Sequence, residues 1–121
     1  MKSKYTGVYD IEGLPQGTDF DIMIDYQYGE PATTVDLTGY SGKLQVRKNY
    51  EGGVLLELTS TDGEIVFDSA APNITISFPH EKTDDMTTFC DMIYDLEITS
   101  PGGLITRVIQ GSFSLDRQVT R

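Results

Sequence analysis

The stretch Phe20-Asp-Ile22-Met-Ile24-Asp-Tyr26-Gln-Tyr28 decides the fold class of this chain. Its even positions are all apolar, and its odd positions are mostly acidic or polar. Because successive side chains of a β-strand point to opposite faces, this alternation predicts one face in a core and one toward water or a partner. The same period returns several times, for example in Ile74-Thr-Ile-Ser-Phe78, and it almost never gives way to a helical period.

Turn signals separate these alternating runs at short intervals. Gly29-Glu-Pro31 and Pro101-Gly-Gly103 favour turns, and Thr61-Asp-Gly63 predicts a hairpin. Short strands with turns every ~8–12 residues are typical of a sandwich. We therefore expect an all-β fold, namely an immunoglobulin-like or fibronectin-like antiparallel β-sandwich of about 7–8 strands. Residues 79–87 are the one place for a helical turn, which Thr83 would cap.

The chain of 121 residues has the length of one domain. We place the β-sandwich domain at residues 16–121. Residues 1–15 do not have the pattern of a core segment, because their alternation is short and Gly13-Leu-Pro15 interrupts it. This N-terminal segment is either the first strand of the sandwich or an arm that pairs with a neighbouring subunit.

Composition argues against several classes of partner. The formal net charge is −10, and such a chain repels the phosphates of nucleic acids and anionic lipids. We therefore expect no nucleic acid and no membrane as a partner, and no apolar run approaches the ~20 residues that span a bilayer. The N-terminus lacks the apolar segment of a signal peptide, and the single Cys90 rules out an internal disulfide.

No catalytic, cofactor-binding or metal-binding constellation stands out in the sequence. His80, the only histidine, follows a strand and is expected in an exposed loop. Cys90 falls on the inward face of a predicted strand, where a free cysteine usually acts as a small buried hydrophobe. Asp19, Asp21 and Asp25 share one face of a strand, yet residues two apart lie about 7 Å apart, too far for one shared ion. We expect a protein that is not an enzyme and needs no cofactor or metal.

The last hairpin has a predicted register. Pairing Ile98 with Ile105 across the Pro-Gly-Gly turn keeps the apolar residues of both strands on one face. This register places Ile93 and Val108 together on the outer face. It also places Arg107 on the inner face, so Arg107 lies at the sheet margin or a bulge shifts it outward.

The C-terminal third carries Tyr94-Asp-Leu-Glu-Ile-Thr-Ser-Pro-Gly-Gly-Leu-Ile-Thr-Arg107-Val-Ile-Gln-Gly111-Ser-Phe-Ser-Leu115, and the chain ends in Gln118-Val-Thr-Arg121. Upstream stand Gln16-Gly-Thr-Asp-Phe20, Val35-Asp-Leu-Thr-Gly-Tyr40 and Leu44-Gln-Val-Arg47. Together these motifs resemble a family of small tailed-phage virion structural proteins. The Asp-Leu-Thr-Gly-Tyr element also resembles the N-terminal sandwich domain of phage baseplate and upper-fibre adaptor proteins. The resemblance covers roughly residues 16–121.

The resemblance implies an immunoglobulin-like virion component without enzymatic activity. We expect a tail, baseplate, collar or fibre-attachment component that acts by protein–protein docking, located in the virion and in the host cytoplasm during assembly. Its expected partners are other virion proteins, and a homo-oligomer is expected in the assembled particle. Two alternatives stay open: a capsid decoration protein, and a carbohydrate-binding accessory domain, although the chain lacks Trp and the row of aromatics typical of such domains.

Exposed apolar residues and residues near the chain ends are the candidates for the docking interface. Scattered apolar residues are normal on a surface, whereas a contiguous patch marks an interface. Tyrosines near the ends of the sandwich are further candidates, because function concentrates in loops. The predicted interface residues are Tyr5, Tyr9, Ile93, Leu104, Val108, Arg117 and Arg121.

Overall fold

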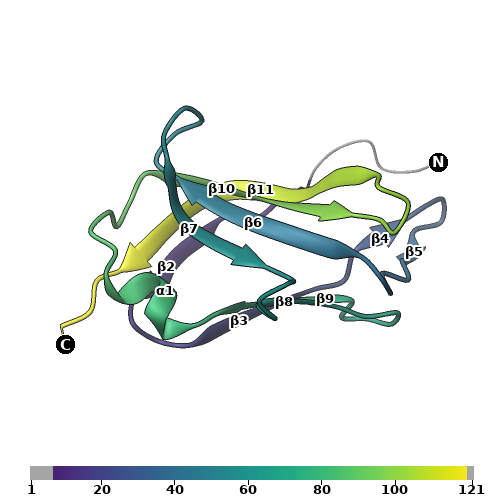
Figure 1. Cartoon of the computed structure of the whole chain (residues 1–121), viewed down its shortest axis with the longest axis horizontal. Coiled ribbons are helices and arrows are strands. Elements are labelled where there is room, and N and C mark those ends of the chain that lie inside the picture. The colour runs from purple at the N-terminus through teal and green to yellow at the C-terminus, as the bar shows by residue number, and fades with distance from the viewer. Residues whose placement is uncertain (1–6, 120–121) are drawn as a thin grey trace.

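A computed structural model describes residues 7–119 and shows two β-sheets packed face to face (Figure 1). The larger sheet, sheet A, has the strand order β1-β11-β10-β6-β7, and β2 also pairs with β11. Its strands are β1 (Gly7–Val8), β2 (Ile11–Pro15), β6 (Ser41–Arg47), β7 (Val54–Thr59), β10 (Met92–Thr99) and β11 (Ile105–Asp116).

The smaller sheet, sheet B, has the strand order β3-β9-β8. These strands are β3 (Phe20–Ile24), β9 (Ile74–Phe78) and β8 (Ile65–Phe67). A separate two-stranded ribbon joins β4 (Gln27–Tyr28) to β5 (Thr33–Thr34), and one short helix, α1 (His80–Asp84), links sheet B to sheet A. Sheet B lies below sheet A in Figure 1, with α1 at the end that holds the C-terminus.

The core lies between the two sheets and is built by the period-two pattern of the strands. On β9, Ile74, Ile76 and Phe78 are fully buried, while the residues between them are partly exposed. Phe78 of sheet B meets Phe113 of sheet A with ring centroids 5.9 Å apart, so the two inner faces pack directly. Burying one such side chain is worth about 1.5–3 kcal/mol, which makes this layer the main source of stability.

The expected all-β sandwich is confirmed. The described residues form eleven strands, of which β1, β4 and β5 are only two residues long. Most strand pairs are antiparallel, but β1 and β2 run parallel to β11. The parallel pairs were not expected, because the sequence pattern of a strand does not say which neighbour it will meet.

The N-terminal segment pairs with sheet A from residue 7 onward, as the first-strand alternative requires, and the expectation that it contributes nothing to the core is wrong. Ile11 and Leu14 are 5% and 2% exposed, and both pack into the main hydrophobic cluster. They are three residues apart rather than two, and Gly13 with φ +68 lies between them. A register shift against β11 absorbs the extra residue, so both side chains reach the same face. Strands β1 and β2 are therefore part of the sandwich.

The turn at residues 61–63 does not close a hairpin, contrary to expectation. It follows β7, the edge strand of sheet A, and leads to β8 of sheet B. The backbone does turn tightly there, with Gly63 N–H donating to the Ser60 carbonyl. The turn chemistry located the reversal correctly, but the chain changes sheets at that point.

Two buried amides tie the loops to the strands. Asn73 is fully buried, and it accepts from the Tyr26 N–H and donates to the carbonyls of Tyr26 and Val35. Gln16 is 2% exposed and donates to the carbonyls of Thr83 and Met86 beside α1. Because these amides satisfy backbone groups that water cannot reach, they hold the two ends of the sandwich closed.

Helix α1 forms where the sequence predicts a helical turn, but Thr83 does not cap it. The N-cap residue is Pro79, with no side-chain cap bond, and Thr83 lies inside the helix and is fully buried. Its hydroxyl accepts a hydrogen bond of 2.8 Å from the Gly17 N–H instead. Thr83 thus fixes α1 to the connection between β2 and β3.

Candidate binding surfaces

The predicted interface residues do not form one surface. Ile93 lies on the outer face of sheet A, and Leu104, 72% exposed, lies in the β10–β11 turn. Arg117 follows β11 at the opposite end of that strand, and its guanidinium lies 5.2 Å from the centre of the Phe89 ring. Tyr9 is half exposed between β1 and β2, and its carbonyl accepts the Tyr94 hydroxyl. The remaining predictions, Tyr5 and Arg121, lie outside the described residues.

Val108 is not an interface residue, because it is 5% exposed and belongs to the core. The predicted register is wrong by one residue at the turn, since Ile98 pairs with Thr106. A bulge then separates the Leu96–Ile109 pair from the Glu97–Arg107 pair. The bulge turns Arg107 outward, as one of the two stated alternatives for that residue requires, and it turns Val108 inward.

Cys90 is exposed, and the expectation of a buried thiol is wrong. Strand β10 begins at Met92, two residues later than the alternation suggested. Asp91 has φ 60 and breaks the alternation just before the strand. The Cys90 thiol consequently faces outward and donates to the Asp91 carboxylate at 3.7 Å.

His80 lies in an exposed cluster with two carboxylates. Its Nδ1 is 3.0 Å from Asp19 Oδ1 and 3.4 Å from Glu81 Oε1. The hydrogen bond to Asp19 and then the charge of Glu81 raise the pKa of His80. The bond from the His80 backbone N–H, followed by the bond from the ring, lowers the pKa of Asp19. These three exposed groups lie close enough to hold a metal ion, but surface ion pairing accounts for the geometry equally well.

The outer face of sheet B is nearly free of charge. Met23, Thr75 and Val66 are paired across its three strands and form one row, which we call the Met23 row. Met23 is 65% exposed and Val66 is 48% exposed. Asp21 is the only charged residue within the strands of this sheet. An apolar centre with an acidic edge therefore faces away from the core.

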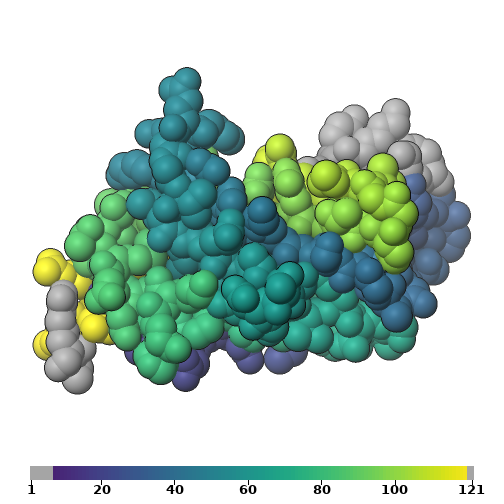
Figure 2. Space-filling view, in the orientation of Figure 1, coloured from purple at the N-terminus to yellow at the C-terminus, as the bar shows by residue number. Residues whose placement is uncertain are grey.

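The outer face of sheet A is hollowed into a trough of about 450 Å³. The loop between β6 and β7 rises along one side and carries Tyr50, which is 86% exposed, and β1 with Val8 lines the other side. Figure 2 shows this loop projecting from the body of the molecule. The floor is formed by β6, β10 and β11, and its side chains include Lys43, Gln45, Ile93, Asp95, Glu97 and Gln110.

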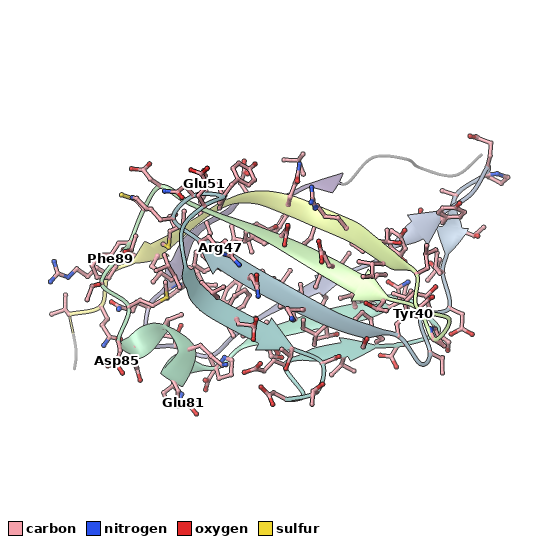
Figure 3. All side chains as sticks on the ribbon, turned by 45° about the horizontal axis from the view of Figure 1, so that its top comes forward. Tyr40, Arg47, Glu51, Glu81, Asp85 and Phe89 are labelled. Atoms are coloured by element: carbon pink, nitrogen blue, oxygen red, sulfur yellow. The ribbon has the colours of Figure 1, made fainter. Side chains whose placement is uncertain are left out.

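Hydrogen bonds between neighbouring strands hold the side chains around the trough. Gln45 donates to Glu57 Oε2 at 2.6 Å, and Arg47 donates to Gln45 Oε1 at 3.0 Å. Figure 3 shows Arg47 beside the loop that carries Glu51, and its second nitrogen donates to the Gly52 carbonyl of that loop. Across the sheet, Arg107 lies 3.4 Å from Asp95 Oδ2. Charged groups of both signs therefore alternate over this face.

Comparisons with known proteins returned nothing for this chain: no family model, no curated protein and no solved structure matches it. Within residues 7–119, no helix is long and apolar enough to cross a membrane.

Two features of these surfaces escaped sequence reasoning. Val66 lies between the buried Ile65 and the half-buried Phe67, so the period-two pattern of this short strand signals its exposure. The trough has no such local signal. Its floor combines Gln45 with Asp95 and Gln110, and only the pairing of distant strands brings these residues together.

Proposed function

We propose that this protein is a non-enzymatic docking module of a tailed-phage virion, a tail, baseplate, collar or fibre-attachment component. The single observation that carries the proposal is the Met23 row on the outer face of sheet B. The resemblance of residues 16–121 to virion structural proteins supports the location in the particle, and in the host cytoplasm during assembly. An immunoglobulin-like topology and a homo-oligomer in the particle belong to the same proposal.

The chemistry of the Met23 row suits a protein partner. The centres of protein interfaces are depleted of charge and enriched in methionine and aromatic residues. Charged residues make up 23% of the whole chain, yet only Asp21 is charged in the strands of sheet B. Met23 and Val66 therefore supply the apolar centre, and Asp21 with the exposed Asp19 supplies an acidic rim. Such a surface fits a partner with an apolar centre and a basic rim.

The surroundings of the two most reactive side chains, His80 and Cys90, support a binding role. Among residues 7–119, His80 contacts carboxylates and Cys90 contacts Asp91. Nucleophilic catalysis needs a hydroxyl or thiol next to a base that a third group orients. The arrangement around these two residues resembles surface ion pairing more closely than such a constellation.

The location is tested by immunogold labelling of phage particles released from the strain whose genome encodes this chain. Antibodies raised against the purified chain are expected to place gold on the tail or baseplate. Gold distributed over the head would replace the tail assignment with capsid decoration. Intact particles that carry no gold, and no band for this chain in an immunoblot of the same particles, would contradict a virion role.

The docking face is tested by complementation of a phage that lacks this gene. Particles are assembled with plasmid-borne wild type, Met23→Asp or Leu104→Asp, and the amount of the chain per particle is measured by immunoblot. We expect Met23→Asp to reduce incorporation at least about tenfold, because it places a charge in the interface centre. Leu104→Asp is the matched control, since Leu104 is 72% exposed against 65% for Met23 but lies in the β10–β11 turn. If only Leu104→Asp blocks incorporation, the docking face is at that turn.

A further inference from the structure

The trough on sheet A carries a chemistry different from that of the Met23 row, and we propose that it binds a neutral oligosaccharide. This inference goes beyond the docking role, and it uses the opposite face of the sandwich. The volume of about 450 Å³ lies within the range of ~300–1,000 Å³ that is usual for small-ligand sites.

A row of planar polar groups crosses the trough. Strand pairing aligns Gln45, Asp95 and Gln110 across the floor, and Val8 of β1 follows Gln110. Glu57 of β7 continues the row beside the trough. Neighbouring strands lie about 4.8 Å apart, so the row presents a polar group at each such step. Carboxylates offer only acceptors, whereas amides offer donors and acceptors. Sugar hydroxyls both donate and accept, and this alternating row matches them.

The row is held in place before any ligand arrives. Gln45 is fixed between Glu57 and Arg47, while Arg107 contacts both Asp95 and Gln110 at 3.4 Å. Immobilising a flexible side chain on binding costs about 0.5–1.5 kcal/mol, and these contacts have already restricted the side chains. Each of these contacts uses one oxygen of a group that has further lone pairs or N–H donors. The groups are thus oriented but still able to bind hydroxyls.

Apolar contacts complete the site. The Tyr50 ring stands at the side of the trough, and Ile93 and Val8 line it as well. A sugar ring has an apolar face of C–H groups, which packs on an aromatic ring while the hydroxyls at its edge remain free for hydrogen bonds. Tyr50 is therefore the stacking residue of the proposed site.

Charge balance selects a neutral ligand. The residues that line the trough include two basic ones, Lys43 and Arg47, and two acidic ones, Asp95 and Glu97. Lys43 of β6 lies directly opposite Glu97 of β10 in the strand register. An anionic or cationic sugar would leave one of these groups facing a like charge. A neutral oligosaccharide meets no such repulsion.

A polypeptide strand fits the trough less well. The floor strands β6, β10 and β11 have partners on both sides, so their backbone groups are engaged in the sheet and another strand cannot be added there. The floor is also rich in charge, unlike the centre of a protein interface. The Met23 row has the opposite properties, which separates the two proposed ligands between the two faces.

The first experiment applies the full fluorescent chain to an array of immobilised neutral and charged oligosaccharides. We expect binding to neutral members that is unchanged by NaCl between about 0.1 and 0.5 M, because a neutral ligand has no ionic attraction to be screened. Binding only to sulfated or sialylated members would overturn the neutral class. An array on which no oligosaccharide binds would overturn the proposal.

The second experiment titrates the best oligosaccharide from the array, free in solution, into variants by calorimetry. We expect Tyr50→Ala and Gln110→Ala each to weaken binding about tenfold or more, and Met23→Ala to leave it unchanged. Tyr50 is almost fully exposed, so its replacement does not endanger the fold. Unchanged affinity in both trough variants would overturn the site. Loss of particle incorporation in Tyr50→Ala but not in Met23→Asp would identify the trough as a protein site instead.

Discussion

Sheet A and sheet B differ in what they present and in how they are held. On sheet A, Lys43, Arg47 and Arg107 alternate with acidic residues. The strands of sheet B contain a single charged residue, Asp21. Sheet A has long ladders between its strands, and sheet B has three short strands that depend on Asn73 for their connection to the neighbouring loop. A net charge of −10 therefore describes neither face. The placement of charge by strand pairing decides what each can bind.

The largest effect is expected from placing a charge on the inner face of β9. Ile76→Asp would bury an unpaired carboxylate in the core and should cost more than about 4 kcal/mol, which unfolds the domain. Thr75→Asp changes the neighbouring outer position and should cost less than about 1 kcal/mol. Circular dichroism with urea titration measures both. Equal losses would show that the face assignment of sheet B is wrong.

The second effect concerns the attachment of sheet B. Asn73→Ala leaves the Tyr26 N–H and the carbonyls of Tyr26 and Val35 without their partner. We expect a loss of about 2–4 kcal/mol, since each buried group that loses its hydrogen bond costs about 1–3 kcal/mol and water can replace part of the loss. Thermal unfolding measures the change. Hydrogen exchange should show faster opening of residues 26–35 than of β10. Uniform acceleration would argue that the two sheets are held alike.

The third effect concerns the attachment of the N-terminal strands to sheet A. A Cβ at Gly111 would lie 2.4 Å from the Tyr9 carbonyl oxygen and 2.8 Å from Asp10 Oδ1. Gly111→Ala should therefore displace Tyr9 and Asp10, which connect β1 to β2, and lower the free energy of unfolding by about 1–3 kcal/mol. Gly53→Ala is the control, because nothing lies within 4 Å of its Cβ position. Denaturant titration compares the two, and equal midpoints would contradict the close packing of β1 and β2 on β11.

The smallest effect is a pH dependence at the exposed His80 cluster. Because the pKa of His80 is raised in the folded state, protonated His80 stabilises the fold. This stabilisation is fully present below the unfolded pKa of about 6.5 and is lost as pH rises through the folded pKa. The lowered pKa of Asp19 makes its contribution present above about pH 3.9 and lost as pH falls through the folded value. The pair is therefore most stabilising between about pH 4 and 6.5.

The measurement is the urea midpoint of wild type and His80→Gln over this range. Wild type should lose a small advantage between about pH 6 and 8, and the variant should show a flatter profile. Parallel profiles would indicate that the contact between His80 and Asp19 contributes nothing in solution.

Much of the sheet structure followed from local pattern, because period two specifies the faces of a strand. Ile74, Ile76 and Phe78 were placed inward correctly, and the same holds for Leu96. Where the faces were assigned wrongly within a strand, a bulge adds a residue and exchanges the faces. This explains the burial of Val108 on β11.

The candidate surfaces were less predictable than the strands. Leu104 is exposed as expected, because a residue next to a Pro-Gly-Gly turn has few neighbours to cover it. The trough depends on Gln45, Asp95 and Gln110 becoming neighbours through long-range pairing. Such pairing is determined by the whole fold, and no segment of the sequence contains it.

The parallel pairing of β1 and β2 with β11 has a consequence for synthesis. Asp10 accepts a hydrogen bond from the Ser112 N–H across a sequence separation of 102 residues. Ile11 and Leu14 therefore cannot be buried until β11 has been synthesised and has left the ribosome. Chains dominated by such distant contacts fold slowly, and their apolar segments remain open to aggregation in the meantime. A nascent chain stalled before β11 should accordingly recruit chaperones.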